Sequence, residues 1–152
     1  MSLNAQMELY QQVILEHNKN PRNYKEMIDS SHHAEGFNPL CGDHFWVYLK
    51  IDGSAKIDEV TFKGDGCAIS KASASMMTVA LKGKTVDEAR KMIAEFTQLV
   101  RGEMPADQSQ NSLGKLNIFS GIWKYPSRVK CAVLACHAAG GAFSQQTTVS
   151  SE

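Results

Sequence analysis

The chain has 152 residues, with 16 Lys and Arg against 16 Asp and Glu, so its formal net charge is zero. Hydrophobic residues make up 43% and charged residues 21%, a balance typical of a folded domain and not of a disordered chain. The absence of net positive charge argues against non-specific nucleic-acid binding. We therefore predict a single domain over residues 1–143, a frayed tail over 144–152 and no nucleic-acid partner.

The first twenty residues carry many polar side chains, among them Asn4, Glu8 and Glu16, which leaves no room for the apolar region of a signal peptide. No window approaches the roughly 18 consecutive apolar residues that a membrane span needs. The sequence therefore predicts a cytoplasmic protein with no membrane partner. In that setting its four cysteines are better suited to metal ligation or thiol chemistry than to disulfides.

The hydrophobic pattern predicts one helix followed by a small sheet. Apolar residues recur at helical spacing up to about His17, and residues 18–23 end that helix. Residues 44–51 alternate as a strand, and an Asp-Gly turn signal separates them from a second strand over residues 57–63. A weaker signal over residues 31–37 adds a third strand.

The rest of the chain is predicted to be mainly helical. One helix covers residues 68–81, and another runs to about Arg101 behind the capping box that Thr85 opens. Residues 102–111 are polar and predict a surface loop, and residues 116–123 predict a short helical turn.

The last helix is predicted to start near Pro126 and to run to about Ala139, where Gly140 and Gly141 stop it. Strands first and helices afterwards predict an α+β fold. We expect a small three-stranded antiparallel sheet packed with helices.

Three cysteines occupy positions that favour thiolate chemistry. Cys41 lies in a loop bracketed by Pro39 and Gly42, ahead of the first strand of the hairpin. Cys67 opens the helix over residues 68–81, and Cys131 lies in the first turns of the last helix. The N–H groups and the dipole at a helix N-terminus favour thiolate, the form that binds metal or attacks sulfur.

A carboxylate can complete a metal site with these thiolates. Asp43, two residues from Cys41, can present its side chain on the same side of the chain. Three thiolates and one carboxylate make a tetrahedral zinc set with a formal net charge of −2. Arg128, one helical turn before Cys131, can supply a compensating cation.

The residues alone leave a simpler interpretation open. The intervals between Cys41, Cys67 and Cys131 match no short C-x-x-C motif, and free cysteines commonly fill core space. Cys136 lies about 140° from Cys131 around the helix and is expected to pack in the core. The histidines, His17, His44 and His137 among them, show no ligand spacing.

Three segments, taken together, carry a resemblance. NPLCGD at 38–43, GDGCAISKASASMMT at 64–78 and SRVKCAVLACHA at 127–138 resemble the signature segments of the NifU-N/IscU/SufU family of iron-sulfur cluster assembly proteins. The resemblance spans nearly the whole chain. It implies the family's three-stranded sheet packed with helices, and a metal site.

The resemblance is closer to the SufU branch than to the IscU branch. The IscU type has a His immediately before its third cysteine, where this chain has Lys130. The SufU type carries an extra segment between its second and third cysteines, which residues 101–123 resemble. A departure from the SufU pattern is Cys136, where similar sequences usually have Trp; this leaves a redox role for that thiol open.

The resemblance implies a zinc-dependent sulfurtransferase that works with a SufS-like cysteine desulfurase and with downstream cluster assembly proteins. Its implied zinc ligands are Cys41, Asp43, Cys67 and Cys131, with Cys41 as the sulfur acceptor and Arg128 as its helper. Two other functions remain open. The same ligands can hold a [2Fe-2S] cluster or iron on an assembly scaffold, and a structural zinc domain is the third hypothesis.

Overall fold

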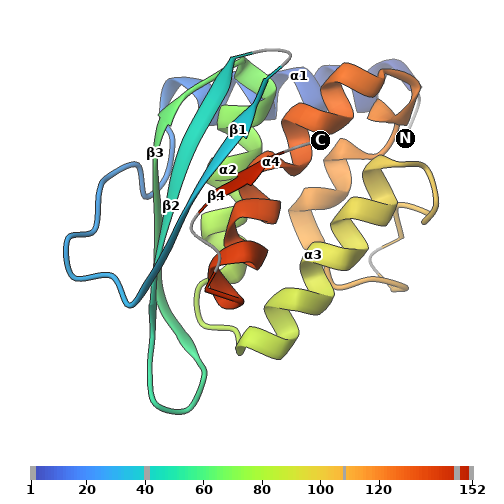
Figure 1. The fold of residues 1–152 in the computed structure, drawn as a ribbon. Coiled ribbons are helices and arrows are strands. Elements are labelled where there is room, and N and C mark those ends of the chain that lie inside the picture. Colours follow the sequence, from blue (N-terminus) through green and yellow to red (C-terminus); the bar gives the residue numbers. More distant parts are fainter. Residues whose placement is uncertain (1–2, 40–41, 108, 146–147, 151–152) are drawn as a thin grey trace.

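The computed structural model describes residues 3–39, 42–107, 109–145 and 148–150. Figure 1 shows helices packed against a sheet, as expected for an α+β fold. In chain order the elements are α1 (Leu3–Lys19), β1 (His32–Asn38), β2 (Asp43–Ile51), β3 (Ile57–Asp65), α2 (Ala68–Leu81), α3 (Val86–Val100), the 3-10 helices η1 (Gly114–Phe119) and η2 (Ile122–Lys124), α4 (Pro126–Phe143) and β4 (Thr148–Ser150).

The sheet has four strands in the order β3-β2-β1-β4, so the prediction of three antiparallel strands is wrong in number and direction. Strands β1, β2 and β3 are antiparallel, but β4 runs parallel to β1. This strand comes from residues 148–150, in the segment predicted to fray. A three-residue strand shows little alternation in the sequence, and its pairing with the otherwise open edge of β1 is a tertiary contact.

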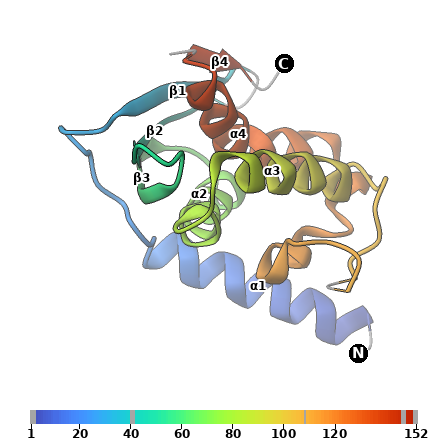
Figure 2. The same cartoon turned by 90° about the horizontal axis from the view of Figure 1, so that it is seen from below.

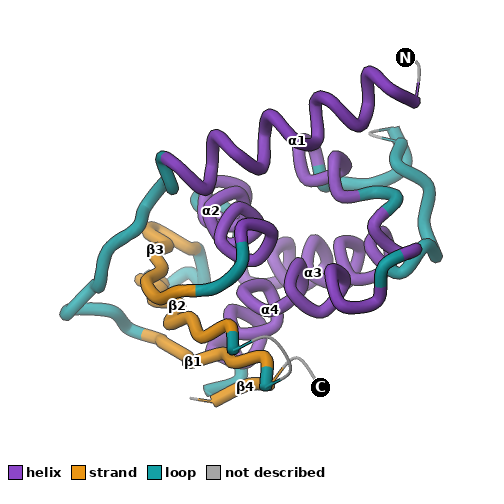
Figure 3. Tube along the Cα trace, turned by 90° about the horizontal axis from the view of Figure 1, so that it is seen from above, coloured by secondary structure: helices purple, strands orange, loops and turns teal. Residues whose placement is uncertain are grey.

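Alternation along the strands decides which face of the sheet is covered. Residues such as Val47, Leu49 and Phe62 are fully buried, and α2 and α4 pack against the sheet. Figure 2 shows α1 and α3 on the far side of these two helices. Figure 3 shows the same layers from the opposite side, with the strands along one side of the helices.

Helix α4 lies very close to β1 because β1 carries a glycine at the contact. A Cβ atom at Gly36 would lie 3.2 Å from Ala138 Cβ and 3.3 Å from Leu134 Cδ1. Cys131 is one turn before Leu134 on the same side of the helix. The close approach at Gly36 therefore brings Cys131 to the end of β1.

The predicted stop of α4 at Gly140 and Gly141 is wrong, since the helix continues to Phe143. Gly141 is buried, and a Cβ atom at Gly140 would lie 3.9 Å from Ile93 Cδ1 of α3. Each glycine costs a helix about 1 kcal/mol relative to Ala. Packing of this stretch against α3 offsets that cost, which the sequence pattern cannot show.

Within residues 101–123, the second half packs into the hydrophobic core. Apolar side chains of this part are buried, and Phe119 makes edge-to-face contacts with Phe96 of α3 and Tyr10 of α1 at ring-centroid distances of 5.5 and 6.1 Å. Glu95 of α3 accepts hydrogen bonds from the backbone N–H of Ser112, at 3.1 Å, and from its hydroxyl. This segment therefore ties α1 to α3.

Along the described ranges of the chain, no helix combines the length and the apolar character that a membrane crossing requires.

Candidate metal centre

One end of the sheet gathers ligand atoms from three elements. There, β1 turns into β2, β3 leads into α2, and α4 makes its second turn. Ligand atoms of Asp43, Cys67 and Cys131 all lie within 4.8 Å of one another. These residues, three of the four predicted ligands, are called the metal-ligand cluster below.

Strand pairing and a hydrogen bond to α2 hold Asp43 in place. It starts β2 opposite Asn38 of β1, and its side chain is 2% exposed. Its Oδ1 accepts the backbone N–H of Cys67 at 2.9 Å, and its Oδ2 lies 3.9 Å from Cys67 Sγ. The carboxylate thus ties the start of β2 to the start of α2.

Cys67 is the N-cap residue of α2. Its Sγ accepts the backbone N–H of Ser70 at 3.4 Å and lies 3.4 Å from Ser70 Oγ. The Cys131 thiol donates to it as well, and these hydrogen bonds lower the pKa of Cys67 from 9.0 to about 6, against burial and the charge of Asp43. Cys67 is therefore the thiolate of the pair.

Cys131 is the protonated member of the same pair. It is buried, and the Asn38 side-chain amide donates to its Sγ at 3.9 Å. Its hydrogen bond to Cys67, burial and the carboxylate of Asp43 all raise the pKa of Cys131. One proton between two sulfurs, beside a buried carboxylate, is the arrangement that a divalent cation would replace.

Sequence reasoning missed the residues that support this cluster. A Cβ atom at Gly66 would lie 2.6 Å from Ser70 Oγ and 2.7 Å from Asp43 Oδ1, so only glycine leaves room for the carboxylate there. The signal was the Gly-Asp-Gly stretch directly before Cys67. Nothing in the sequence indicated Asn38 or Ser70 as hydrogen-bond partners of the sulfurs.

Cys41, the fourth predicted ligand and the predicted sulfur acceptor, lies outside the described residues. Gly42, directly after it, is described. Gly42, at φ +74°, donates its N–H to the Asn38 carbonyl at 2.9 Å, so the chain returns to the cluster directly before Asp43.

Arg128 is exposed in the first turn of α4. Its guanidinium carbon lies 4.6 Å from the ring centroid of Tyr125, a cation–π contact. Burial raises the pKa of the half-buried Tyr10, and the charge of Arg128 lowers it. Arg128 forms no salt bridge within the described ranges.

The other candidate side chains have structural partners. Cys136 is buried in the hydrophobic core, and burial raises the pKa of this thiol to about 12. His17 is hydrogen-bonded to Ser75 at 2.7 Å, His44 to Glu35, and His137 to Thr97 at 3.2 Å. Among the residues that the structure describes, none of these four belongs to a metal-ligand group.

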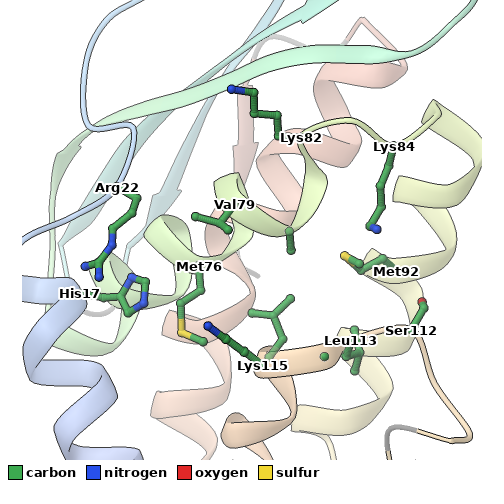
Figure 4. A pocket seen from close by; sticks show the side chains of 13 residues that line it. His17, Arg22, Met76, Val79, Lys82, Lys84, Met92, Ser112, Leu113 and Lys115 are labelled. Atoms are coloured by element: carbon green, nitrogen blue, oxygen red, sulfur yellow. The ribbon is translucent and has the colours of Figure 1, made fainter.

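A separate pocket of about 530 Å³ lies between α1, α2, α3 and η1. Figure 4 shows His17, Arg22 and Met76 on one side of it and Lys84 and Met92 on the other. Its lining contains no Cys, Asp or Glu, so this pocket is distinct from the metal-ligand cluster.

Comparison with known proteins identifies the family of this fold and site. The family model described as the NifU-like N-terminal domain matches residues 9–132. The chain therefore belongs to the NifU-like N-terminal domain family.

The chain is 42% identical to the zinc-dependent sulfurtransferase SufU of Bacillus subtilis over 136 residues, which cover 89% of this chain and 90% of that protein. It is 36% identical to the iron-sulfur cluster assembly scaffold protein IscU of Streptococcus pyogenes, over 91% of this chain and 84% of that one. Among solved structures, a protein of Fervidobacterium islandicum described as a cluster assembly scaffold for the SUF system aligns with a TM-score of 0.80 and 33% identity, over 86% of this chain and 93% of that one.

Proposed function

We propose that this protein takes part in iron-sulfur cluster assembly by accepting persulfide sulfur from a cysteine desulfurase at a zinc centre. The observation that carries the proposal is the convergence of the Asp43 carboxylate with the Cys67 and Cys131 thiols within 4.8 Å. The similarity to SufU over 89% of the chain supports zinc and sulfur transfer in particular.

The cluster fits Zn²⁺ in donor type and spacing. Tetrahedral zinc with Zn–S bonds of about 2.3 Å holds its ligand atoms roughly 3.5–3.8 Å apart. Asp43 Oδ2 and Cys67 Sγ are already 3.9 Å apart, and all three donors require only small movements. Cys41 is the proposed fourth ligand, because its Cα lies at most about 7 Å along the chain from that of Asp43.

Bound zinc would hold the cysteines as thiolates at neutral pH and would tolerate exchange of one ligand without redox change. The three cysteine ligands then have different roles. Cys67 and Cys131 are fixed on α2 and α4 by hydrogen bonds, which suits ligands that stay in place. Cys41 follows Pro39 in a connection between two strands, which suits the thiolate that leaves.

The chemical step is an exchange between two sulfur groups. The Cys41 thiolate attacks the terminal sulfur of the desulfurase Cys–S–SH group, forming a new S–S bond. The S–S bond of the donor breaks, its cysteine leaves as a thiolate, and the sulfhydryl proton remains on the transferred sulfur. Sulfur is transferred without net oxidation or reduction. Arg128, exposed in the first turn of α4 and about one turn before Cys131, is the proposed cation that compensates negative charge at this thiolate.

The experiment combines the protein with a SufS-like cysteine desulfurase and free cysteine, followed by mass spectrometry of the intact protein and its peptides. We expect a gain of about 32 Da, one sulfur atom, on the peptide that contains Cys41. Cys41→Ala should abolish stimulation of the desulfurase, and Arg128→Ala should weaken it. Sulfur on Cys67 or Cys136, together with normal turnover of Cys41→Ala, would overturn the proposal.

Assembly of a [2Fe-2S] cluster on the same ligands is the second candidate. It is favoured by the similarity to IscU of Streptococcus pyogenes and by the sulfur-rich donor set, which iron also accepts. Lys130, where the IscU type has His, favours the sulfur relay. Reconstitution with iron and sulfide separates the two, since a stoichiometric cluster that transfers to an apo-ferredoxin would support the scaffold.

A purely structural zinc role is less favoured by the packing. The core contains many fully buried large side chains from sheet and helices alike, including Phe45, Phe62 and Phe96. Such a core is large enough to fold without a metal cross-link. Chelation should therefore remove zinc and leave the circular dichroism spectrum folded.

A further inference from the structure

The pocket of about 530 Å³ between α1, α2, α3 and η1 combines an apolar floor with a basic rim. Met76 of α2 and Met92 of α3 form part of the floor and are almost fully buried, and Val79 lies beside the pocket with 55% of its surface exposed. Of the thirteen described residues that line the pocket, five are basic and none is acidic. The basic residues are His17, Arg22, Lys82, Lys84 and Lys115.

The protein itself neutralises only part of this positive charge. Within the described ranges, Lys82, Lys84 and Lys115 form no salt bridge. Arg22 forms one with Glu16, at 3.0 Å on the exposed surface. The C-terminal ends of α1 and α2 together offset about one further charge. The rim of the pocket therefore keeps an excess of positive charge, in a chain whose formal net charge is zero.

The pocket continues into a second hollow of about 700 Å³ along α1. Leu9, Val13 and Glu16 line this hollow from one face of α1, because they recur at helical spacing, and Ile118 of η1 lines it as well. The two hollows share His17, Met76, Gly114 and Lys115. They therefore form one elongated groove, called the basic groove below, whose shape suits a chain segment better than a small anion.

The cations of the basic groove lie on two sides of its apolar floor. Figure 4 shows the side chain of Lys115 directed towards Met76 and that of Lys84 directed towards Met92. Methionine side chains adapt to apolar groups of different shape and are common where proteins bind amphipathic segments. A ligand that fits this arrangement carries an apolar side chain for the methionines and carboxylates on either side of it for the lysines.

We propose that the basic groove is a docking site for an acidic, amphipathic segment of a partner protein. Complementary charge guides and orients the segment, and the apolar contact adds affinity. The docking site is separate from the metal centre. Met76 follows Cys67, the N-cap of α2, by nine residues, which is about 13 Å along the helix. A segment bound in the groove therefore leaves the metal-ligand cluster accessible.

The test selects a random library of short peptides, displayed on phage, against the native protein. Binders that do not need the groove are removed with the Lys84→Glu/Lys115→Glu variant. We expect the enriched sequences to contain Asp or Glu on either side of Leu, Ile, Phe or Met. Enrichment of basic or uncharged sequences would overturn the proposal. A selection in which no enriched sequence depends on the two lysines would overturn it as well.

An enriched peptide is then synthesised, and its affinity is measured by fluorescence anisotropy. Lys84→Glu and Lys115→Glu should each weaken binding by about tenfold, because a like charge then faces a carboxylate. Val79→Ala should weaken it by about threefold through lost apolar contact. Lys63→Glu is the matched control, since it makes the same charge change at an exposed position of β3, and it should change the affinity less than about twofold.

Two further outcomes would overturn the proposal. An equal loss of affinity in Lys63→Glu would show that the peptide responds to overall charge and not to the groove. Displacement of the peptide by citrate beyond that caused by sodium chloride at equal ionic strength would assign the groove to a small anion. The zinc content of these variants should stay unchanged, because none of the substituted residues belongs to the metal-ligand cluster.

Discussion

The two ends of the sheet satisfy their polar groups in different ways. At the end away from the cluster, Asp52 Oδ1 accepts the N–H groups of Ser54 and Lys56 at 2.8 and 3.0 Å, and Ile57 exchanges backbone hydrogen bonds of 2.8 Å with Lys84 and Gly83. At the cluster end, the acceptors are sulfurs at longer distances: Cys67 Sγ accepts the Ser70 N–H at 3.4 Å, and Cys131 Sγ accepts the Asn38 amide at 3.9 Å.

This difference shows how one small sheet can be stable and still hold a reactive centre. At the far end, the polar groups are paired by short N–H···O hydrogen bonds within the protein, so this end of the sheet needs no ligand. The cluster end brings the buried Asp43 and Cys131 together with the half-buried Cys67, and burying charged groups is costly unless they are paired or bound to a metal. A divalent metal bound there would offset part of that cost.

The largest expected effect comes from removing a fixed ligand. Cys67→Ser and Cys131→Ser should each lower the zinc content of the purified protein from about one ion per chain to nearly none, because a neutral hydroxyl is a poor replacement for thiolate. Cys136→Ala is the matched control, since this thiol is buried in the core away from the cluster, and it should keep its zinc. Elemental analysis measures all three. Full zinc in both serine variants would show that the ligands are misassigned.

A glycine at each end of the sheet gives the next comparison. Gly66→Ala should weaken zinc binding by at least tenfold and destabilise the fold by about 1–3 kcal/mol, because the new Cβ meets Asp43 Oδ1 at 2.7 Å. Gly53→Ala in the far turn meets nothing within 4 Å and should change stability by less than about 0.5 kcal/mol. Chelator competition and urea unfolding measure the two effects. Equal effects at both positions would contradict the steric argument.

The pH dependence of thiol alkylation tests the hydrogen bonds of the cluster. In metal-free protein, Cys67 should reach half of its maximal rate near pH 6, because the Cys131 thiol and Ser70 lower its pKa from 9.0 to about 6. Cys131→Ala should raise that midpoint most, and Ser70→Ala should raise it less. Peptide mapping after timed iodoacetamide treatment gives the profiles.

The lowered pKa of Cys67 also predicts how the stability of the metal-free protein changes with pH. A group whose folded pKa lies below its unfolded value stabilises the fold fully above the unfolded pKa, near 9, and loses this contribution as pH falls towards about 6. The raised pKa of Cys131 acts in the opposite direction above pH 9. Through Cys67, metal-free protein should therefore become more stable from pH 6 to 9, and Cys67→Ala should reduce this slope in urea titrations.

The smallest effect on the centre is expected at the far turn. Asp52→Ala removes the acceptor of two backbone N–H groups and should cost about 1 kcal/mol of stability. Zinc affinity and the alkylation profile of Cys67 should stay unchanged, since the turn lies at the opposite end of the strands. A shift in either quantity would mean that the two ends of the sheet are coupled.

The sequence by itself determined the elements whose signals are local. The Thr85–Glu88 capping box forms with both hydrogen bonds, and the predicted strand alternation over residues 44–51 appears in β2. The family was also visible in the sequence, because its three signature segments are contiguous stretches. Local chemistry likewise marked Asp43, Cys67 and Cys131 as candidates, because Asp43 lies two residues from Cys41 and the two cysteines lie in the first turns of predicted helices.

Only the tertiary structure decided what depends on contacts between distant residues. The pairing of residues 148–150 with β1 and the continuation of α4 through Gly140 both arise from packing partners that no local window contains. The bond from Asn38 to the sulfur of Cys131, and the space that Gly66 leaves for the Asp43 carboxylate, also appear only after the chain has folded. Asn38 and Cys131 are 93 residues apart in the sequence. Their hydrogen bond forms because α4 packs against β1.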